Sequence, residues 1–186
     1  MTMIAYPEVL IEAPTAGAAI TAAAATSMLP SSAIKTLEPN FFRRLGQSIT
    51  IEASGIISSV ITTPGTARFD VRFGSTTVFD GLAVLLDTVA AHTSVPWKLR
   101  ITLTLRATGS IANLFPDAQW TCEDILGVPA TAPKGVLTAM LPWNTNPPTV
   151  GSNFDASASQ TVDLRFTQTV ATGSCTLQTY KLISDN

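Results

Sequence analysis

The sequence contains one histidine, two cysteines and few charged residues, and each shortage excludes a class of function. Because His92 is the only histidine, any Ser-His-Asp or Cys-His arrangement depends on it, and a zinc site has at most one imidazole ligand. It stands in the stretch Ala90–Ser94, which is typical of a polar surface loop. No glycine-rich phosphate-binding motif, EF-hand spacing or Cys-x-x-Cys pair occurs. We therefore expect no catalytic residues, no cofactor and no metal. The protein is not expected to be an enzyme.

The carboxylates give no sign of a paired acid and base. Glu123 and Asp124 are the only adjacent couple, and neighbours in a strand point to opposite faces, so they would not flank one glycosidic bond. The other candidates are scattered on or beside polar strand faces, where solvated charge is expected: Asp70, Asp80, Asp87, Asp155 and Asp163. The sequence leaves open a calcium site assembled from several loops.

Charged residues make up 13% of the chain and the mean hydropathy is +0.31. In ordinary globular domains about a quarter of all residues are charged, so the surface of this chain must be poor in charge. We expect part of it to be covered by other subunits or by another protein. The net charge of −2 and the sequence pI of about 5.3 provide no basic footprint, so nucleic acid is not an expected partner.

No apolar run reaches the roughly 18 to 20 residues that a membrane-spanning helix needs, so no membrane partner is expected. The small, apolar residues 16–25 follow Glu8 and Glu12, and the first basic residue is Lys35, which does not fit a secretory signal. Cys122 and Cys175 permit one disulfide, but free, buried thiols are expected for a protein assembled in a reducing cytoplasm.

The clearest pattern in the chain is the alternation of apolar and polar residues from Trp97 to Arg106. Period-two alternation places every apolar side chain on one face of a strand, as in an antiparallel sheet that covers a core. The same pattern recurs in three further segments and predicts an inward set consisting of Ile49, Ile51, Phe69, Val71, Phe73, Leu99, Ile101, Leu103, Val162, Leu164 and Phe166. Strands are expected near residues 47–61, 66–73, 76–80, 97–107, 117–123, 135–141, 160–169 and 174–183. The fold class is therefore all-β, an antiparallel β-sandwich.

Turn chemistry separates these strands. Thr63-Pro64-Gly65 suits a type II turn and predicts a hairpin of the strands on either side, and Gly74, Gly109 and Gly173 punctuate later strands. Pro142–Gly151 contains three prolines, which cannot sit within a ladder, and is predicted to be a loop. This loop carries Trp143, which a ligand or a partner subunit could reach, although packing onto the chain's own sandwich is an equal alternative.

The length of 186 residues fits one core and divides into an N-terminal arm, residues 1–30, and a sandwich domain, residues 31–186. The arm is expected to be extended or loosely held, and to enter the body with Ala23–Leu29 as a first strand. Tyr6, Val9, Leu10 and Ile11 form an apolar anchor that the arm itself cannot bury, so we expect it to lie against a partner. Its deletion should therefore change the stability of the isolated chain little. A frayed terminus is the alternative.

Several motifs together resemble a group of tailed-bacteriophage virion structural proteins. They are Leu37–Phe42, Gly46–Gly55, Phe69–Gly74, Val95–Leu99, Phe154–Leu164 and the strand Gln178–Leu182, which follow in the expected order. The resemblance covers roughly residues 28–186. It implies a jelly-roll protein of the virion without enzymatic residues, on the capsid or on the tail.

The function expected from these observations is a capsid decoration or cement protein. It would stabilise the capsid exterior as a homotrimer, bound to the phage major capsid protein and assembled in the host cytoplasm. The expected interface residues are Tyr6, Val9, Leu10, Ile11 and Trp143. The alternative is a receptor- or carbohydrate-binding module on a tail or fibre, with a host surface glycan as partner and Trp143 as the aromatic contact.

Overall fold

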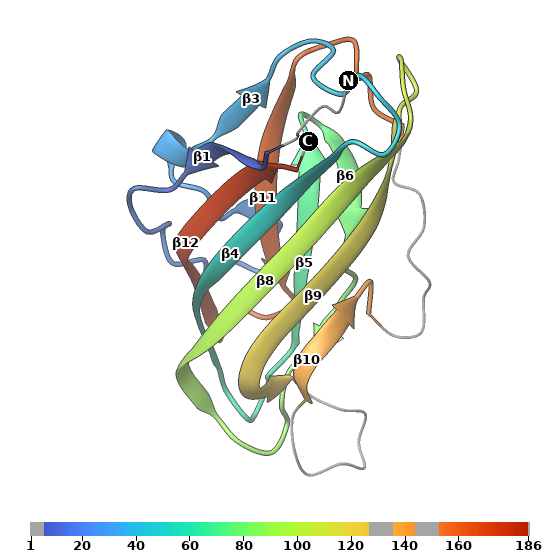
Figure 1. Cartoon of the computed structure of the whole chain (residues 1–186). Helices are drawn as coiled ribbons and strands as arrows, with labels where there is room; N and C mark the ends of the chain where they lie inside the picture. Colours follow the sequence, from blue (N-terminus) through green and yellow to red (C-terminus); the bar gives the residue numbers. More distant parts are fainter. Residues whose placement is uncertain (1–5, 127–135, 144–152, 186) are drawn as a thin grey trace.

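The computed structural model describes residues 6–126, 136–143 and 153–185. They form two antiparallel sheets packed face to face, which confirms the predicted all-β sandwich (Figure 1). The strands are β1 (Glu8–Glu12), β2 (Thr26–Ser27), β3 (Lys35–Leu37), β4 (Ser48–Ser59), β5 (Thr66–Phe73), β6 (Thr76–Asp80), β7 (Val84–Leu85), β8 (His92–Ala107), β9 (Asn113–Leu126), β10 (Val136–Leu141), β11 (Gln160–Gln168) and β12 (Ser174–Ser184).

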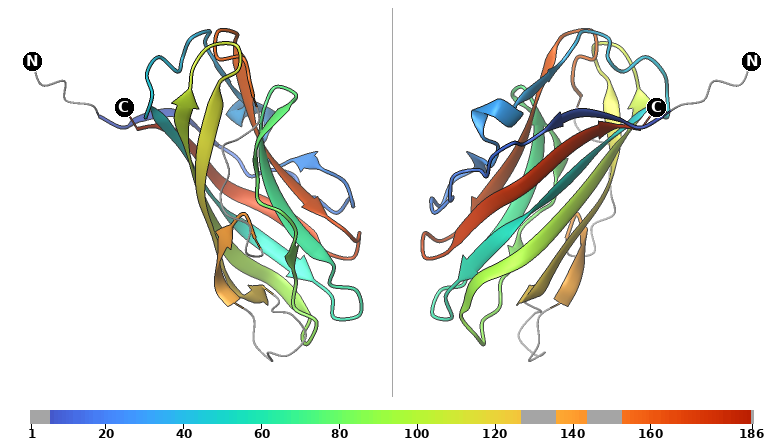
Figure 2. Two further views of the ribbon diagram at one scale, coloured as in Figure 1. Left: turned by 90° about the vertical axis from the view of Figure 1, so that its right-hand side faces the viewer. Right: turned by 60° about the vertical axis from the view of Figure 1, so that its left-hand side comes forward.

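The strand order is that of a jelly roll. The large sheet runs β1-β12-β4-β8-β9-β10, and the small sheet runs β2-β11-β5-β6, with β3 also on β11 and β7 on β5. The connections β1–β2, β3–β4, β4–β5 and β11–β12 cross between the sheets, and β5 and β6 form a hairpin, as in a double Greek key. The β9–β10 pair extends the large sheet beyond β8. Figure 2 shows the two layers edge-on in its left view.

Period-two alternation fixes which face of each strand is buried. All eleven residues predicted to point inward are buried, and Ile101 at the middle of β8 has no exposed surface. A shift of register by one residue would expose the whole set, so the apolar pattern specifies the pairing. Trp97 lies opposite Gly55 on β4, and its ring occupies the space that a Cβ at that position would need. The sandwich thus tolerates no side chain at residue 55.

The turn at Thr63-Pro64-Gly65 does not make the predicted hairpin. Gly65 has a positive φ of 67°, as turn chemistry requires, but β4 belongs to the large sheet and β5 to the small sheet. Local residues therefore reverse the chain direction without deciding which strands pair. The partners of β4 are β12 and β8, whereas β5 pairs with β11 and β6 in the other sheet. Gly74 does turn a hairpin, because Phe73 pairs with Thr76.

The N-terminal segment lies on the sandwich of its own chain. β1 pairs with β12, and the backbone N–H groups of Ala13, Gly17 and Ile20 donate to carbonyl groups of β12 at 2.9 to 3.0 Å. The chain then crosses to the small sheet, where the Met28 N–H donates to the Leu164 carbonyl oxygen at 2.9 Å. Residues 8–29 therefore supply strands to both sheets, and a boundary at residue 30 does not separate an arm from the sandwich. The first strand is β1, whereas Ala23–Leu29 contributes only the two-residue β2.

Candidate interaction surfaces

The residues predicted as an apolar anchor are divided between two environments. Tyr6 and Val9 are 72% and 51% exposed. Leu10 and Ile11 are half-buried and pack against the core, so the chain buries part of the anchor itself. The adjacent Leu10 and Ile11 are both half-buried because β1 completes the edge of the large sheet and its register with β12 shifts between Val9 and Ile11. These residues do not form one exposed apolar group.

Trp143 is half-buried and packs against the core cluster. Its backbone N–H donates to the Gly81 carbonyl oxygen at 3.0 Å, which ties the segment after β10 to the segment after β6. Packing onto the chain's own sandwich, the alternative that the sequence left open, is therefore what the structure shows for this residue. Residues 144–151 of the predicted loop lie outside the described part of the chain.

The lone histidine is paired and not a free loop residue. His92 begins β8, and its Nε2 lies 2.9 Å from Asp87 Oδ2, with only 11% of its side chain exposed. Burial acts to raise the pKa of Asp87, but hydrogen bonds from His92 and from the N–H groups of Val89 and Ala90 outweigh it and lower the pKa overall. The expectation of a polar surface loop was wrong because the strand extends five residues before Trp97.

A serine lies directly opposite His92, but the three residues do not form a catalytic triad. Ser59 on β4 is the cross-strand neighbour of His92. Its Oγ is buried and makes no hydrogen bond with any described residue. A nucleophile must be hydrogen-bonded to its base and open to substrate, and Ser59 is neither. Among the described residues no three His, Cys, Asp or Glu side chains gather to hold a metal ion.

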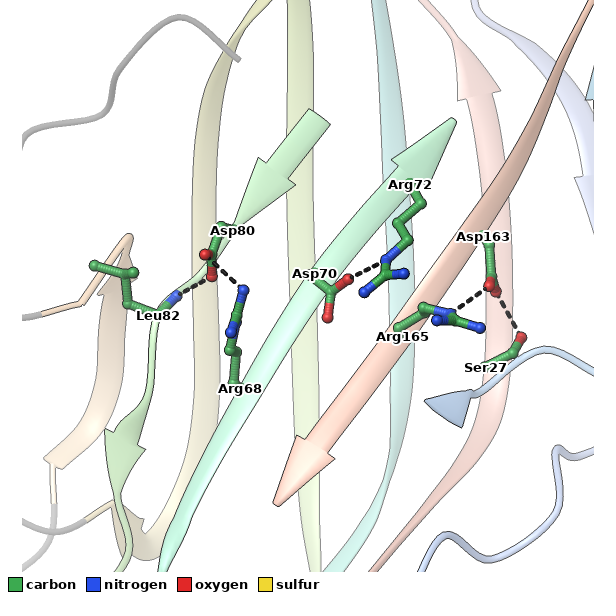
Figure 3. A network of polar contacts seen from close by, with 8 residues as sticks. All are labelled: Ser27, Arg68, Asp70, Arg72, Asp80, Leu82, Asp163 and Arg165. Carbon is green, nitrogen blue, oxygen red and sulfur yellow. Dashed lines mark hydrogen bonds and ion pairs between the residues drawn. The ribbon is translucent and has the colours of Figure 1, made fainter. Parts of the chain in front are cut away.

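All five carboxylates that were predicted to be solvated form hydrogen bonds or ion pairs with nearby residues. Asp87 pairs with His92, and Asp155 accepts hydrogen bonds from the N–H and hydroxyl of Ser157, which lower its pKa. The other three belong to a network on the outer face of the small sheet that consists of Ser27, Arg68, Asp70, Arg72, Asp80, Asp163 and Arg165 (Figure 3). The structure does not describe the side chains of Glu123 and Asp124.

This network is balanced in charge, with three arginines and three aspartates. Arg72 and Arg165 each donate Nε to the aspartate two residues earlier on the same strand, at 3.0 and 2.8 Å. Register also places Arg72 opposite Asp163 and Arg165 opposite Asp70. The Asp70 carboxylate is only 2% exposed, although it lies on the solvent side of the sheet, so the surrounding groups cover it. The network leaves no excess charge for a ligand and serves the structure of the small sheet.

The outer face of the large sheet has a polar depression of about 450 Å³ over β12, β4, β8 and β9. Three cations and one carboxylate line it: Lys98, Arg100, Lys181 and Glu52. Lys181 pairs with Glu12 at 3.2 Å, whereas Lys98 and Arg100 have no ion pair or hydrogen bond with any described residue. An adjoining depression of about 520 Å³ shares Lys98 and is lined by Gly55, Pro96 and Trp97.

The second candidate surface is the end of the sandwich opposite the termini, formed by residues 60–65, 85–91 and 169–173 and named here the loop end (Figure 1). The three segments contact one another: the Leu86 N–H donates to Gly65 at 3.1 Å and the Thr172 hydroxyl to Thr63 at 3.0 Å. The loop end exposes three large apolar side chains, Ile61 at 45%, Leu85 at 45% and Val89 at 58%.

Charge is nearly absent from the loop end. Its only ionisable side chain is Asp87, which is 13% exposed and already paired with His92. The opposite end also exposes apolar residues, Leu45 at 65% and Ile111 at 66%, but Arg43 and Arg44 directly precede Leu45. Sequence reasoning missed the loop end because its exposed apolar side chains come from two separate segments, 60–65 and 85–91, which only the fold brings together. The signal that could have revealed it was the scarcity of charge in the three segments, in which Asp87 is the only ionisable residue.

No family model and no curated protein matches this chain. In the part of the chain that the structure describes, no helix is long and apolar enough to cross a membrane.

Proposed function

We propose that this chain is a non-enzymatic structural protein of a tailed-phage virion that decorates or cements the capsid exterior. The loop end carries the proposal, because it combines three exposed large apolar side chains with no free charge. The buried centres of protein interfaces are depleted of charge in the same way, since burying a charge without a partner is costly. In this proposal the loop end contacts the major capsid protein and the opposite end, with both termini, faces outward.

Two further observations support a structural role. The sequence motifs between Leu37 and Leu182 resemble virion structural proteins, and the strand order is a jelly roll, an architecture of viral capsid domains. The fold alone does not decide the function, since lectin domains also use it. The low charge content of 13% supports a surface that is partly covered in a homotrimer or by the shell.

The experiment is co-sedimentation of the purified full-length chain with capsids that lack it, prepared from the phage that encodes it. Wild type should saturate the capsids at a fixed stoichiometry. The double variant Ile61→Ser, Val89→Ser should lose most of this binding, because it removes the apolar contact and leaves the sandwich intact. Leu45→Ser is the matched control at the opposite end and should bind normally.

Failure of the wild type to bind capsids would refute a decoration role, and equal loss in the Leu45 variant would refute the assigned orientation. The second candidate is a carbohydrate-binding module on the tail or fibre, which the polar depression of the large sheet favours. Binding of the chain to isolated tails but not to capsids would support that candidate.

A further inference from the structure

The polar depression lies over β12, β4, β8 and β9 of the large sheet, and Lys98 and Arg100 line it from β8. Both are exposed and stand two residues apart on β8, so their side chains leave the same face about 7 Å apart. Cross-strand register places Glu52 and Gln119 on either side of Arg100, and Ser54 and Thr121 on either side of Lys98. Each cation is thus flanked by groups that can form hydrogen bonds with a ligand.

The charges in the depression favour an anionic ligand. Neither Lys98 nor Arg100 is neutralised by a described residue, although Glu52 is directly opposite Arg100. A carboxylate that reached both would form charge-assisted hydrogen bonds, which are about twice as strong as neutral ones. A long polyanion such as nucleic acid fits poorly, because Asp117 lies beside Arg100 in the neighbouring depression and the whole chain carries a net charge of −2.

An acidic peptide is also a poor fit to this place in the sheet. Extended peptides are recognised at a sheet edge, where unpaired backbone groups are free to bind them. The depression lies over β4, β8 and β9, and each of these strands is paired on both sides. Only side chains can therefore recognise the ligand, which favours a compact molecule that presents its own hydrogen-bonding groups.

The adjoining depression supplies an apolar surface beside the charged one. It is lined by the exposed Pro96 together with the buried Gly55 and Trp97, and it shares Ser54, Lys98 and Thr121 with the polar depression. A ligand that spans both needs an apolar face, several hydroxyl groups and a negative charge. A pyranose ring that bears a carboxylate has all three.

We infer that the outer face of the large sheet binds a carboxylate-bearing saccharide through Lys98 and Arg100. The carboxylate pairs with these two cations, Gln119 and Thr121 bind hydroxyl groups, and the apolar face of the ring rests on the exposed Pro96. The saccharide surface and the loop end are different parts of the molecule. This inference therefore does not rest on the proposed attachment to the capsid.

The test is isothermal titration of the full-length protein with a linear trimer of galacturonate. Its methyl ester keeps the rings and removes the charges, and triglutamate keeps the charges without the rings. The double variant Lys98→Gln, Arg100→Gln should weaken binding of the galacturonate trimer by at least about tenfold, since each charge-assisted hydrogen bond accounts for a factor of this order. Arg106→Gln is the matched control, because Arg106 points outward on the same strand but stacks on Phe115, outside the depression.

Tighter binding of the trimer than of either analogue, lost in the double variant and retained in Arg106→Gln, would support the inference. Thermal unfolding of each variant verifies that it is folded, and exposed substitutions of this kind should leave the unfolding midpoint nearly unchanged. No binding by the wild type at millimolar trimer would overturn the inference. Equal binding of the methyl ester or of triglutamate, or an equal loss in Arg106→Gln, would overturn it as well.

Discussion

At the residue scale, Asp70 is a buried charged side chain in a protein that has few charged residues. Its carboxylate is almost fully buried on the outer side of the small sheet, where the Arg72 Nε donates to it at 3.0 Å. The pair Arg68–Asp80 belongs to the same network, but both its side chains are more than a third exposed. Breaking a buried pair leaves a charge without a partner, whereas an exposed pair contributes little because water screens it.

We therefore predict that Asp70→Ala destabilises the protein by about 2 to 3 kcal/mol, below the full range for a buried pair because Arg72 is 30% exposed. Asp80→Ala should cost about 1 kcal/mol or less. The measurement is urea unfolding of both variants beside the wild type. Equal losses in the two variants would show that the burial of Asp70 has no energetic consequence.

The two thiols are the second residue-scale feature. Both cysteines are buried thiols that form no disulfide bond, as predicted from the sequence. Burial raises the pKa of the Cys175 thiol far above its usual range. Because the thiolate is the reactive form, we predict no reaction of the folded protein with a thiol reagent at pH 8, and reaction of both cysteines after unfolding. Rapid labelling of Cys175 in the folded protein would contradict the burial of its thiol.

At the scale of elements, the N-terminal segment, residues 8–29, is the part whose strand pairing the sequence did not predict. Its alanines, glycines and threonines carry no alternation, so nothing in the pattern predicts that β1 completes one sheet and β2 the other. The determinants are long-range: backbone hydrogen bonds to β12, and the close passage of Gly17 past Met28, where a Cβ would collide with the carbonyl oxygen. By contrast, β5, β11 and the core of β8 were predictable because alternation is local.

Deletion of residues 1–22 tests this assignment. The sequence alone predicts little change in stability, whereas the structure predicts a loss of about 2 kcal/mol or more, since β1 and the buried Ile20 are removed. Deletion of residues 1–6 leaves β1 in place and serves as the control. Thermal and urea unfolding of the two truncated proteins measure the difference. An unchanged midpoint after the longer deletion would show that the segment contributes nothing to the sandwich.

The candidate surfaces could be predicted only in part. Alternation identified Lys98 and Arg100 as outward residues of a strand, but their lack of partners depends on register with β4 and β9, which no local pattern contains. The loop end joins three turns that are distant in sequence. The sequence identified Trp143 as an aromatic residue of a loop. Its packing against the core depends on a long-range contact, the hydrogen bond from the Trp143 N–H to the Gly81 carbonyl oxygen, which no local pattern predicts.

At the scale of the whole molecule, one jelly roll carries two different surfaces. The large sheet presents a polar face with unpaired cations, and the loop end presents apolar side chains without free charge. We predict that the chain forms a homotrimer, in solution or on the particle, since 13% charged residues leave much apolar surface to cover. Native mass spectrometry measures the assembly in solution. Monomer alone, together with particles that lack three-fold density for the protein, would contradict the trimer.

The most direct test of the proposed function is a cryo-electron microscopy map of the intact virion that carries this protein. The proposal predicts density for the sandwich on the capsid exterior, with Ile61, Leu85 and Val89 at the contact with the major capsid protein and β8 and β9 exposed to solvent. Density for the sandwich at the tail or fibre, or on the capsid with the loop end facing outward, would contradict it.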